Sequence, residues 1–324
     1  MLYPVTFKPI LKSVIWGGAD ICPFKGIEPL QKGIGESWEL SHVDGNVSVV
    51  AEGPLAGKTL EELINTYGSQ LLGKKVMDQF GTTFPLLIKF IDTRDHLSIQ
   101  VHPDDELARK RHNSFGKTEM WYVVKASDDA ILYSGFSQQI DADEYVKRVN
   151  DNTIMDVLKK YDVKEGDVFF LPAGRVHAIG AGCFIAEIQQ TSNITYRIYD
   201  FDRRDAEGKG RELHTELAKD AIDYTLYSDY RTSYQPEQNA AVSLASCKYF
   251  TTNLFDLDKE ISRDFSSLDS FVVYICMEGA CVLTDNKGNS LTLKQGQTAL
   301  IPADTTQVKL TPSTGAKLLE TFIG

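Results

Sequence analysis

The side chains best suited to chemistry in this sequence are two histidines, a glutamate and a glutamine carried by predicted strands. The stretch LSIQVHPDD alternates apolar and polar residues, a period of two that is typical of a β-strand. Gln100 and His102 are two positions apart, so their side chains project from the same face of that strand. Glu119 begins the strand-like segment EMWYVV, and His177 follows the segment GDVFFLP. Two imidazoles, a carboxylate and an amide suit Zn²⁺, or alternatively Fe²⁺, Mn²⁺ or Co²⁺.

The composition of this ligand set favours a catalytic metal over a structural one. Closed structural zinc sites usually include cysteine thiolates, and this set contains none. A mixed nitrogen and oxygen set leaves a coordination position for water or substrate. Each residue alone has a simpler explanation: a single strand histidine is more often a hydrogen-bonded polar residue, and Glu119 could pair with Lys117 at the surface. The prediction of a metal site therefore depends on the combination.

The segments that carry these residues are mostly predicted strands. Runs rich in Val, Ile, Tyr, Phe and Thr, broken by Gly, Asn and Asp, dominate the chain, whereas helical patterns are few. Residues 59–72 begin with a capping-box pattern, Thr59 followed by Glu62, and residues 139–163 predict a helical insertion between strands. A mainly β chain with a few peripheral helices predicts a barrel or a sandwich.

The sequence divides into a long first part and a shorter all-β tail. Residues 229–240 are polar and lack periodicity, as a linker does, so we expect a metal-binding domain over 1–230 and a second domain over 240–324. One pattern recurs in both parts: a glycine, an apolar strand and then a proline. His177 follows the proline in the first copy, and Gln307 stands at the matching position in the second. We therefore expect the second domain to lack a metal site.

Charge and composition argue against several classes of function. The 324 residues carry a formal net charge of -11, whereas binding to nucleic acid needs a basic face. No apolar run reaches the ~18 residues of a membrane span, and the N-terminus lacks the layout of a signal peptide. Five cysteines without a CxxC pair predict reduced thiols and a cytoplasmic protein. The expected partner is a small molecule, and nothing in the sequence indicates a required protein partner.

Several motifs resemble those of a known enzyme family. GDVFFLPAGRVH resembles the second cupin motif, with Ala181 where an asparagine often closes it. The segments PLLIKFIDTRDHLSIQVHPDD, GKTEMWYVV, LPAGRVHAIGAG and AEIQQTSNITYRIYDFDR resemble, in the same order, those of type I mannose-6-phosphate isomerases in their short bacterial form. WGG and GESWEL near the N-terminus also resemble signatures of that family. The resemblance extends over the whole chain and implies two cupin, jelly-roll-like β-barrels.

The resemblance implies a reaction and a cofactor. The family interconverts mannose 6-phosphate and fructose 6-phosphate by moving a proton between C1 and C2 through an enediol or enediolate. It binds one zinc ion per chain through Gln, His, Glu and His. In this sequence these ligands fall on Gln100, His102, Glu119 and His177, the same set that the strand pattern indicates.

The resemblance also implies catalytic residues. The active-site arginine of the family falls on Arg197, and its lysine two residues before the glutamate ligand falls on Lys117. A glutamate in the strand approaching the arginine falls on Glu187. We take Glu187 as the first candidate for the base that moves the carbon-bound proton, with His96 and Lys117 as alternatives.

Contacts to the sugar and its phosphate are less well defined by the sequence. Ser98 and Trp16 are expected to contact the substrate, Trp38 could complete an aromatic wall, and Arg203 could help with hydroxyls or phosphate. The chain departs from longer relatives, which carry SDN followed later by AGLTPK, where this chain reads TSNITYRIYDFDR. The lysine of that later motif has no counterpart, so the phosphate contacts stay open.

Two other functions stay open at the level of sequence. A cupin oxygenase would use Fe²⁺ held by histidines and a carboxylate, and a non-catalytic cupin would bind a sugar phosphate without turnover. The amide ligand and the nearby lysine and arginine favour a sugar phosphate over oxygen chemistry. The complete ligand set favours an enzyme over a binding module.

Overall fold

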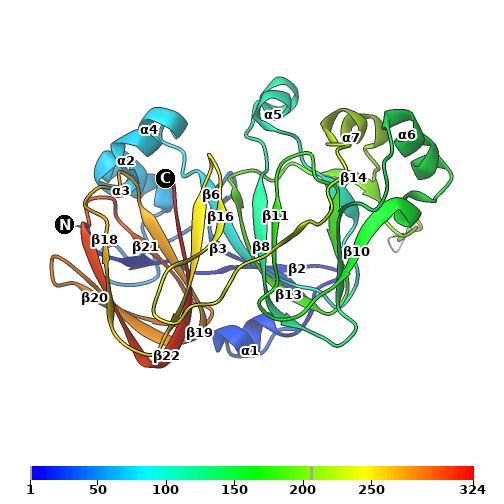
Figure 1. Cartoon of the computed structure of the whole chain (residues 1–324). Coiled ribbons are helices and arrows are strands. Elements are labelled where there is room, and N and C mark those ends of the chain that lie inside the picture. Colours follow the sequence, from blue (N-terminus) through cyan, green and yellow to red (C-terminus); the bar gives the residue numbers. More distant parts are fainter. Residues whose placement is uncertain (1, 205–206) are drawn as a thin grey trace.

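The structure is a computed structural model that describes residues 2–204 and 207–324. Within these residues the strands form sheets of eight, seven, five and two strands, and the helices lie mainly at the periphery (Figure 1). The predicted fold class, mainly β with a few peripheral helices, is confirmed. The expected barrels are open, because no described sheet closes on its own first strand.

Two sheets of the first part of the chain hold the predicted site residues. The seven-stranded sheet has the order β15 (Arg231–Thr232), β11 (Val168–Leu171), β8 (Glu119–Ala126), β13 (Cys183–Gln190), β6 (Leu86–Asp92), β3 (Ile34–Leu40) and β2 (Ile10–Ser13). The five-stranded sheet has the order β10 (Leu158–Asp162), β9 (Ile131–Phe136), β12 (His177–Ile179), β7 (Ile99–Val101) and β14 (Tyr196–Tyr199). The short strands β4 (His42–Val43) and β5 (Asn46–Val47) form a hairpin beside them.

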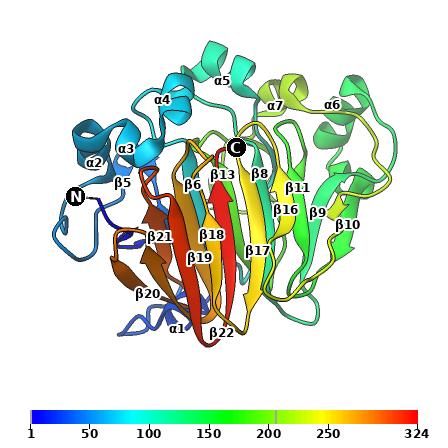
Figure 2. The same cartoon turned by 60° about the vertical axis from the view of Figure 1, so that its left-hand side comes forward.

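The eight-stranded sheet is built mostly from the C-terminal part of the chain, whose strands lie side by side in Figure 2. Its main path is β1 (Val5–Thr6), β21 (Thr298–Ile301), β19 (Val272–Asp285), β22 (Gln307–Phe322), β17 (Thr251–Leu257) and β16 (Val242–Ser246). Two further strands pair with it, β18 (Ile261–Asp264) with β22 and β20 (Ser290–Lys294) with β19. The N-terminal strand β1 therefore belongs to this sheet, and its Val5 lies opposite Leu300.

The helices are α1 (Ile21–Lys25), α2 (Leu60–Tyr67), α3 (Ser69–Leu72), α4 (Lys74–Phe80), α5 (Asp105–His112), α6 (Ala142–Asn150), the 3₁₀ turn η1 (Ile154–Val157) and α7 (Thr215–Ala221). The capping box predicted at Thr59 and Glu62 is present. The single helix expected over 59–72 is divided into α2 and α3, because Gly68 has a positive φ of 48° that ends the first helix. None of the described helices is long and apolar enough to cross a membrane.

Two segments carry more strand than their sequence patterns predict. The insertion expected over 139–163 contains helix α6, but its second half forms β10, which joins the five-stranded sheet beside β9. The expected linker 229–240 contributes the edge strand β15, which pairs with β11. In both places the alternation was too short to read locally, and pairing with an existing sheet edge decides the structure. We keep the division into a domain over 1–230 and a second over 240–324 as a proposal.

The strand β7 shows how the fold directs polar side chains inward. Its apolar residues Ile99 and Val101 are fully buried and pack in one cluster with Tyr145 of α6 and Ala218 of α7. Because successive strand residues point to opposite faces, Gln100 must point away from these helices and towards the seven-stranded sheet. The helices that cover one face of β7 thereby position the polar row on the other.

Candidate metal centre

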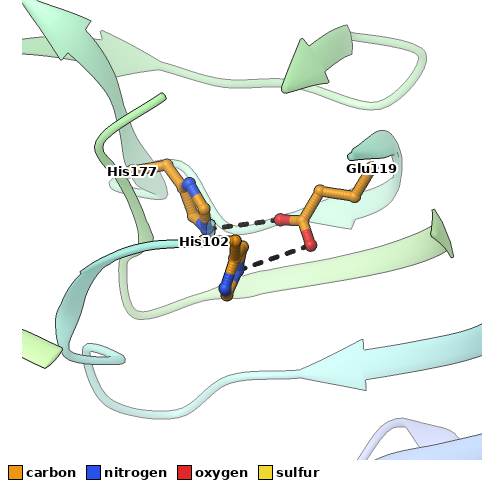
Figure 3. A group of neighbouring side chains, drawn as sticks. All are labelled: His102, Glu119 and His177. Atoms are coloured by element: carbon orange, nitrogen blue, oxygen red, sulfur yellow. Dashed lines mark ion pairs between the residues drawn. The ribbon is translucent and has the colours of Figure 1, made fainter. Parts of the chain in front are cut away.

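Three of the predicted ligands converge between the two sheets, as Figure 3 shows. His102 follows β7 and His177 begins β12 in the five-stranded sheet, whereas Glu119 begins β8 in the seven-stranded sheet. Their ligand atoms all lie within 4.8 Å of one another, and the three side chains are buried. One carboxylate oxygen of Glu119 lies 3.3 Å from Nε2 of His177, and the other lies 3.6 Å from Nε2 of His102. Each sheet therefore supplies part of one cluster.

The backbone fixes both imidazoles so that Nε2 faces the cluster. Nδ1 of His102 lies 2.8 Å from the carbonyl oxygen of Ile194, and Nδ1 of His177 lies 2.8 Å from that of Arg175. A carbonyl can only accept a hydrogen bond, so each Nδ1 carries the proton and each Nε2 presents a lone pair. Burial, reinforced by the charge of Lys117, lowers the pKa of His177 to about 3 and that of His102 well below its usual value. Both rings are therefore neutral at pH 7, as metal ligation requires.

The cluster contains buried polar atoms that lack partners. Oε1 of Glu119 and Nε2 of His177 accept or donate no hydrogen bond within the described part of the chain. A buried polar atom without a partner costs about 1–3 kcal/mol, so native proteins rarely leave two of them side by side. Burial and the nearby charge of Glu187 raise the pKa of Glu119 to about 7. A divalent cation would satisfy these atoms and favour the ionised carboxylate, so the donor set fits a metal ion.

The fourth predicted ligand, Gln100, lies on the strand between two other site residues. It stands directly opposite His177 in the ladder between β7 and β12, and opposite Arg197 in the ladder between β7 and β14. Its side chain lines the same pocket as Lys117. The register of the five-stranded sheet therefore sets an amide beside the imidazole pair.

A buried ammonium contacts the ligand atoms directly. Nζ of Lys117 lies 3.1 Å from Nε2 of His102 and forms a close ion pair with Oε2 of Glu119. The lysine thus uses lone pairs that a metal ion would need, and two cations at one site repel each other. Binding of a metal ion must therefore move Nζ of Lys117 away from His102 and Glu119. The pocket that its side chain lines is the free space into which it can move.

A pocket of about 220 Å³ adjoins the cluster and gathers the residues that the sequence indicated for catalysis and substrate binding. Those residues are Trp16, Ser98, Gln100, Lys117, Glu187 and Arg197. Trp38 also lines it, whereas His96 and Arg203 do not. His96 instead packs against the ring of Phe201 at 5.3 Å between centroids, which removes it from the candidates for the base.

Glu187 is held ionised at the floor of this pocket. Nε1 of Trp121 donates to Oε2 of Glu187 at 2.8 Å, and Nζ of Lys89 lies 3.2 Å from Oε1. Burial alone would raise the pKa of Glu187, but the positive charges of Lys117 and Lys89 outweigh it and lower the pKa to about 2. The carboxylate can therefore accept a proton at neutral pH, although with low intrinsic basicity.

Sequence reasoning missed three charged residues of the pocket, Glu36, Lys89 and Arg211. Lys89 interrupts the otherwise apolar strand LLIKFID and stands opposite Glu187 in the ladder between β6 and β13. Its ammonium lies 5.1 Å from the ring of Trp38, over the aromatic face. A lysine in the middle of a buried strand was the available signal, because such a charge is stable only beside a partner.

Comparison with known proteins agrees with this arrangement. The catalytic domain of type I phosphomannose isomerase matches residues 5–124, and the cupin domain of mannose-6-phosphate isomerase matches residues 241–316. The mannose-6-phosphate isomerase ManA of Bacillus subtilis is 37% identical over 262 residues, which cover 80% of this chain and 81% of that protein. The putative mannose-6-phosphate isomerase YvyI of the same organism is 31% identical over 304 residues, 93% of each chain.

A solved structure extends the likeness to three dimensions. The crystal structure of the mannose 6-phosphate isomerase from Bacillus subtilis superposes with a TM-score of 0.87 at 29% identity, over 99% of both chains. Family matches, curated relatives and overall fold thus agree. The chain belongs to the type I phosphomannose isomerase family of enzymes.

Proposed function

We propose that this chain interconverts mannose 6-phosphate and fructose 6-phosphate with the help of one bound zinc ion. The observation that carries the proposal is a single pocket in which an incompletely satisfied His–Glu–His cluster adjoins an ionised carboxylate and an arginine. Its relatives in Bacillus subtilis and Streptococcus mutans are mannose-6-phosphate isomerases by name. The substrate is a small molecule, and all five cysteines are unpaired, which supports a cytoplasmic location.

The proposed zinc ligands are Gln100, His102, Glu119 and His177. Two neutral imidazoles with oxygen ligands and no thiolate match a catalytic zinc site better than a structural one. When bound, the ion supplies Lewis-acid polarisation of sugar oxygens and stabilises negative charge without taking up a proton. The hydrogen bonds from Nδ1 of His102 and His177 to backbone carbonyls keep both Nε2 atoms directed towards the proposed zinc ion.

Glu187 is proposed to accept the proton from C2 of mannose 6-phosphate and to return it to C1. The electron pair left on carbon forms the enediolate, whose negative charge lies on oxygen. Protonation at C1 then yields the ketose. The charge of Lys117 is one of those that lower the pKa of Glu187. Movement of this ammonium away from Glu187 and towards the substrate oxygens therefore raises the pKa of the carboxylate and makes it a stronger base. This coupling supports Glu187 as base despite its low resting pKa.

A second proton must move between the two oxygens, since O1 gains a proton and O2 loses one. Lys117 is proposed to donate to O1 and to accept from O2, because its Nζ is buried between the metal ligands and the pocket. Arg197 is proposed to stabilise the negative charge of the bound substrate. Its Nε is buried without a hydrogen-bond partner in the described residues, which leaves a donor free. Ser98 and Trp16 are proposed to contact the sugar hydroxyls and its C–H face.

The proposal is tested by removing and restoring the metal. The purified protein is treated with a chelator, dialysed, and assayed for isomerisation before and after addition of Zn²⁺, Fe²⁺, Mn²⁺ or Co²⁺. Activity should disappear on chelation and return most fully with Zn²⁺. His177→Ala should bind less metal and lose activity, whereas His112→Gln, a matched control outside the pocket, should keep both. Isomerisation that survives complete metal removal would contradict the proposal.

The same protein separates the two alternative functions. A cupin oxygenase would consume oxygen in the presence of Fe²⁺ and a reducing substrate. A non-catalytic cupin would bind hexose phosphates with its metal in place but turn none of them over. Each result is distinct from reversible isomerisation, which is measured by the appearance of fructose 6-phosphate.

A further inference from the structure

Positive charge gathers at one edge of the pocket. Arg197 of β14 and Arg211 of the following segment both line the pocket, and Arg203 lies beside them. The lowered pKa of Arg197 results first from burial and then from the charge of Arg211, with a further contribution from Arg203. Three guanidinium groups are therefore close enough to repel one another.

The carboxylate within this group is shared. Oδ2 of Asp200 accepts from Nε of Arg211 at 2.7 Å, and Oδ1 accepts from Nη2 of both Arg211 and Arg203 at 2.5 Å. Asp200 is 5% exposed, so its carboxylate is shielded from water and its charge is balanced by these two guanidinium groups. Nη1 of Arg197 donates to the backbone carbonyl of Glu212, rather than to a carboxylate, at 2.8 Å. The edge thus carries more guanidinium charge than the one buried carboxylate neutralises.

The backbone holds Arg211 against the pocket. The segment that contains it runs alongside β14: N–H of His214 donates to the carbonyl of Arg197 at 2.7 Å, and N–H of Arg197 donates to Nδ1 of His214 at 3.0 Å. The guanidinium of Arg197 then reaches Glu212, the residue next to Arg211. These contacts place the two arginine side chains on one wall, with 37% of the Arg211 side chain exposed.

The cluster side of the pocket carries charges of both signs. Glu187 and Glu36 line the pocket and Glu119 lies in the adjoining cluster, but the ammonium groups of Lys89 and Lys117 lie beside these carboxylates. The arginine edge carries more guanidinium groups than buried carboxylates, so it attracts a phosphate monoester, whose charge is about -1.5 to -2 at pH 7. With C1 and C2 of a hexose phosphate at the cluster, the phosphate then lies at the arginines.

We infer that Arg211 binds the phosphate group of the substrate and so fixes this orientation, an inference that rests on the proposed function. The planar guanidinium can give a phosphate two parallel hydrogen bonds. Asp200 uses Nε and Nη2 of Arg211, which leaves Nη1 facing outward from that pair and holds the side chain in one conformation. Arg211 thus belongs to substrate binding rather than to proton transfer.

The test compares Arg211→Gln, Arg211→Lys and the control Arg204→Gln in the zinc-loaded enzyme. Arg204 is an exposed arginine of the same connection that does not line this pocket. Loss of a hydrogen bond to a charged group should raise KM for mannose 6-phosphate and the inhibition constant of inorganic phosphate about tenfold in Arg211→Gln. The value of kcat should change less than about threefold, because uniform binding is lost. Arg211→Lys should lie between, and Arg204→Gln should match the unaltered enzyme.

An unphosphorylated polyol distinguishes phosphate recognition from general damage. Inhibition by mannitol should be the same in Arg211→Gln and the unaltered enzyme. Equal weakening of mannitol and phosphate inhibition, or no weakening of either, overturns the inference while the isomerase function stands. Absence of isomerisation in the unaltered enzyme would instead overturn the proposed function, and calorimetric titration with inorganic phosphate would still decide whether Arg211 binds the anion.

Discussion

Two buried glutamates, one in each part of the molecule, have contrasting surroundings. Glu119 lies between the seven-stranded and five-stranded sheets, and Glu320 lies in the eight-stranded sheet; both are fully buried. Each oxygen of Glu320 accepts two hydrogen bonds, from the partners Arg263, Tyr274 and Asn253 at 2.6 to 3.1 Å. Glu119 has one oxygen without any hydrogen bond in the described residues. Protein groups can thus satisfy all the hydrogen-bonding capacity of a buried carboxylate, as at Glu320, or leave one oxygen available to a ligand, as at Glu119.

The difference follows from which strands lie beside each carboxylate. Asn253, Glu320 and Tyr274 stand in register on β17, β22 and β19, so neighbouring strands deliver the partners of Glu320 directly. Glu119 instead stands in register with Leu171 on β11 and Gln189 on β13, and the histidines that approach its carboxylate come from the five-stranded sheet. The repeated turn and strand illustrate the same divergence: Gly166 and Gly296 both have positive φ, yet His177 is buried and Gln307 is exposed. The interior around Glu119 therefore leaves ligand atoms available, whereas the interior around Glu320 satisfies its carboxylate with its own polar side chains.

The largest effect on this comparison is expected from removing the carboxylate of Glu119, which has one oxygen without a hydrogen bond in the described residues. Glu119→Gln should lower kcat/KM about 10³-fold or more, because metal stabilisation of transition-state charge is worth several kcal/mol. Its free energy of unfolding should also fall, by about 3 kcal/mol, because the buried ammonium of Lys117 loses its carboxylate partner. Steady-state kinetics with metal analysis and urea denaturation check the two halves. Large destabilisation with intact activity would reverse the roles assigned to the two glutamates.

The complementary change removes the carboxylate of Glu320, whose two oxygens are both hydrogen-bonded. Glu320→Ala should lower the free energy of unfolding by about 3 kcal/mol, because it leaves the partly buried guanidinium of Arg263 without its partner. The kcat of the remaining folded molecules should be unaltered. Denaturant melts report the first effect, with Glu260→Ala as control: Glu260 forms an exposed pair with Lys309 at 3.3 Å, worth about 0–1 kcal/mol. Equal effects of the two variants would show that the buried network contributes no more than a surface pair.

Metal binding should stabilise the protein only through the cluster of His102, Glu119 and His177. Zinc at 100 times its dissociation constant should raise the free energy of unfolding by about 2.7 kcal/mol, since the folded state alone holds the assembled site. His177→Ala should lose that gain. Gln307→His should not acquire a second ion, because position 307 is exposed and has no buried glutamate opposite. Thermal melts with and without zinc, with metal content per chain, check both; two ions bound by Gln307→His would be the contrary result.

The sequence was sufficient for the features that local spacing encodes. The alternation around Gln100 and His102 predicted a strand with one polar face, and apolar partners under α6 and α7 explain why that face points inward. The capping residues of α2 and the mainly β architecture were equally local in origin. Lys117 and Glu119 followed from a motif, and they lie in one cluster with His102.

Features that depend on cross-strand register were not predictable in the same way. Lys89 is explained only by Glu187 on the neighbouring strand, and β1 only by its pairing with β21, nearly the whole chain away. Arg211 lies beside Arg197 because the chain turns back after β14 and His214 hydrogen-bonds to the backbone of Arg197. No local propensity specifies which residues meet in such pairings, because tertiary packing selects the register.

A third buried carboxylate, Asp92 at the end of β6, supplies the smallest and most specific test of the comparison. Its Oδ2 accepts from N–H of Asp20 at 2.6 Å, fewer partners than Glu320 has, and burial raises its pKa to about 6. The folded state therefore binds this proton more tightly than the unfolded chain does. Between about pH 4 and pH 6 the free energy of unfolding should fall as the pH rises, by about 2 kcal/mol in all.

Asp92→Asn should abolish that slope, because an amide does not titrate while it can still accept from the N–H of Asp20. Urea denaturation at half-unit steps of pH measures the slope in both proteins, and Asp78→Asn, on the exposed face of α4, controls for loss of a carboxylate at the surface. A slope that persists in Asp92→Asn would assign the titration to another group. A slope that disappears would assign the titration to the buried carboxylate of Asp92.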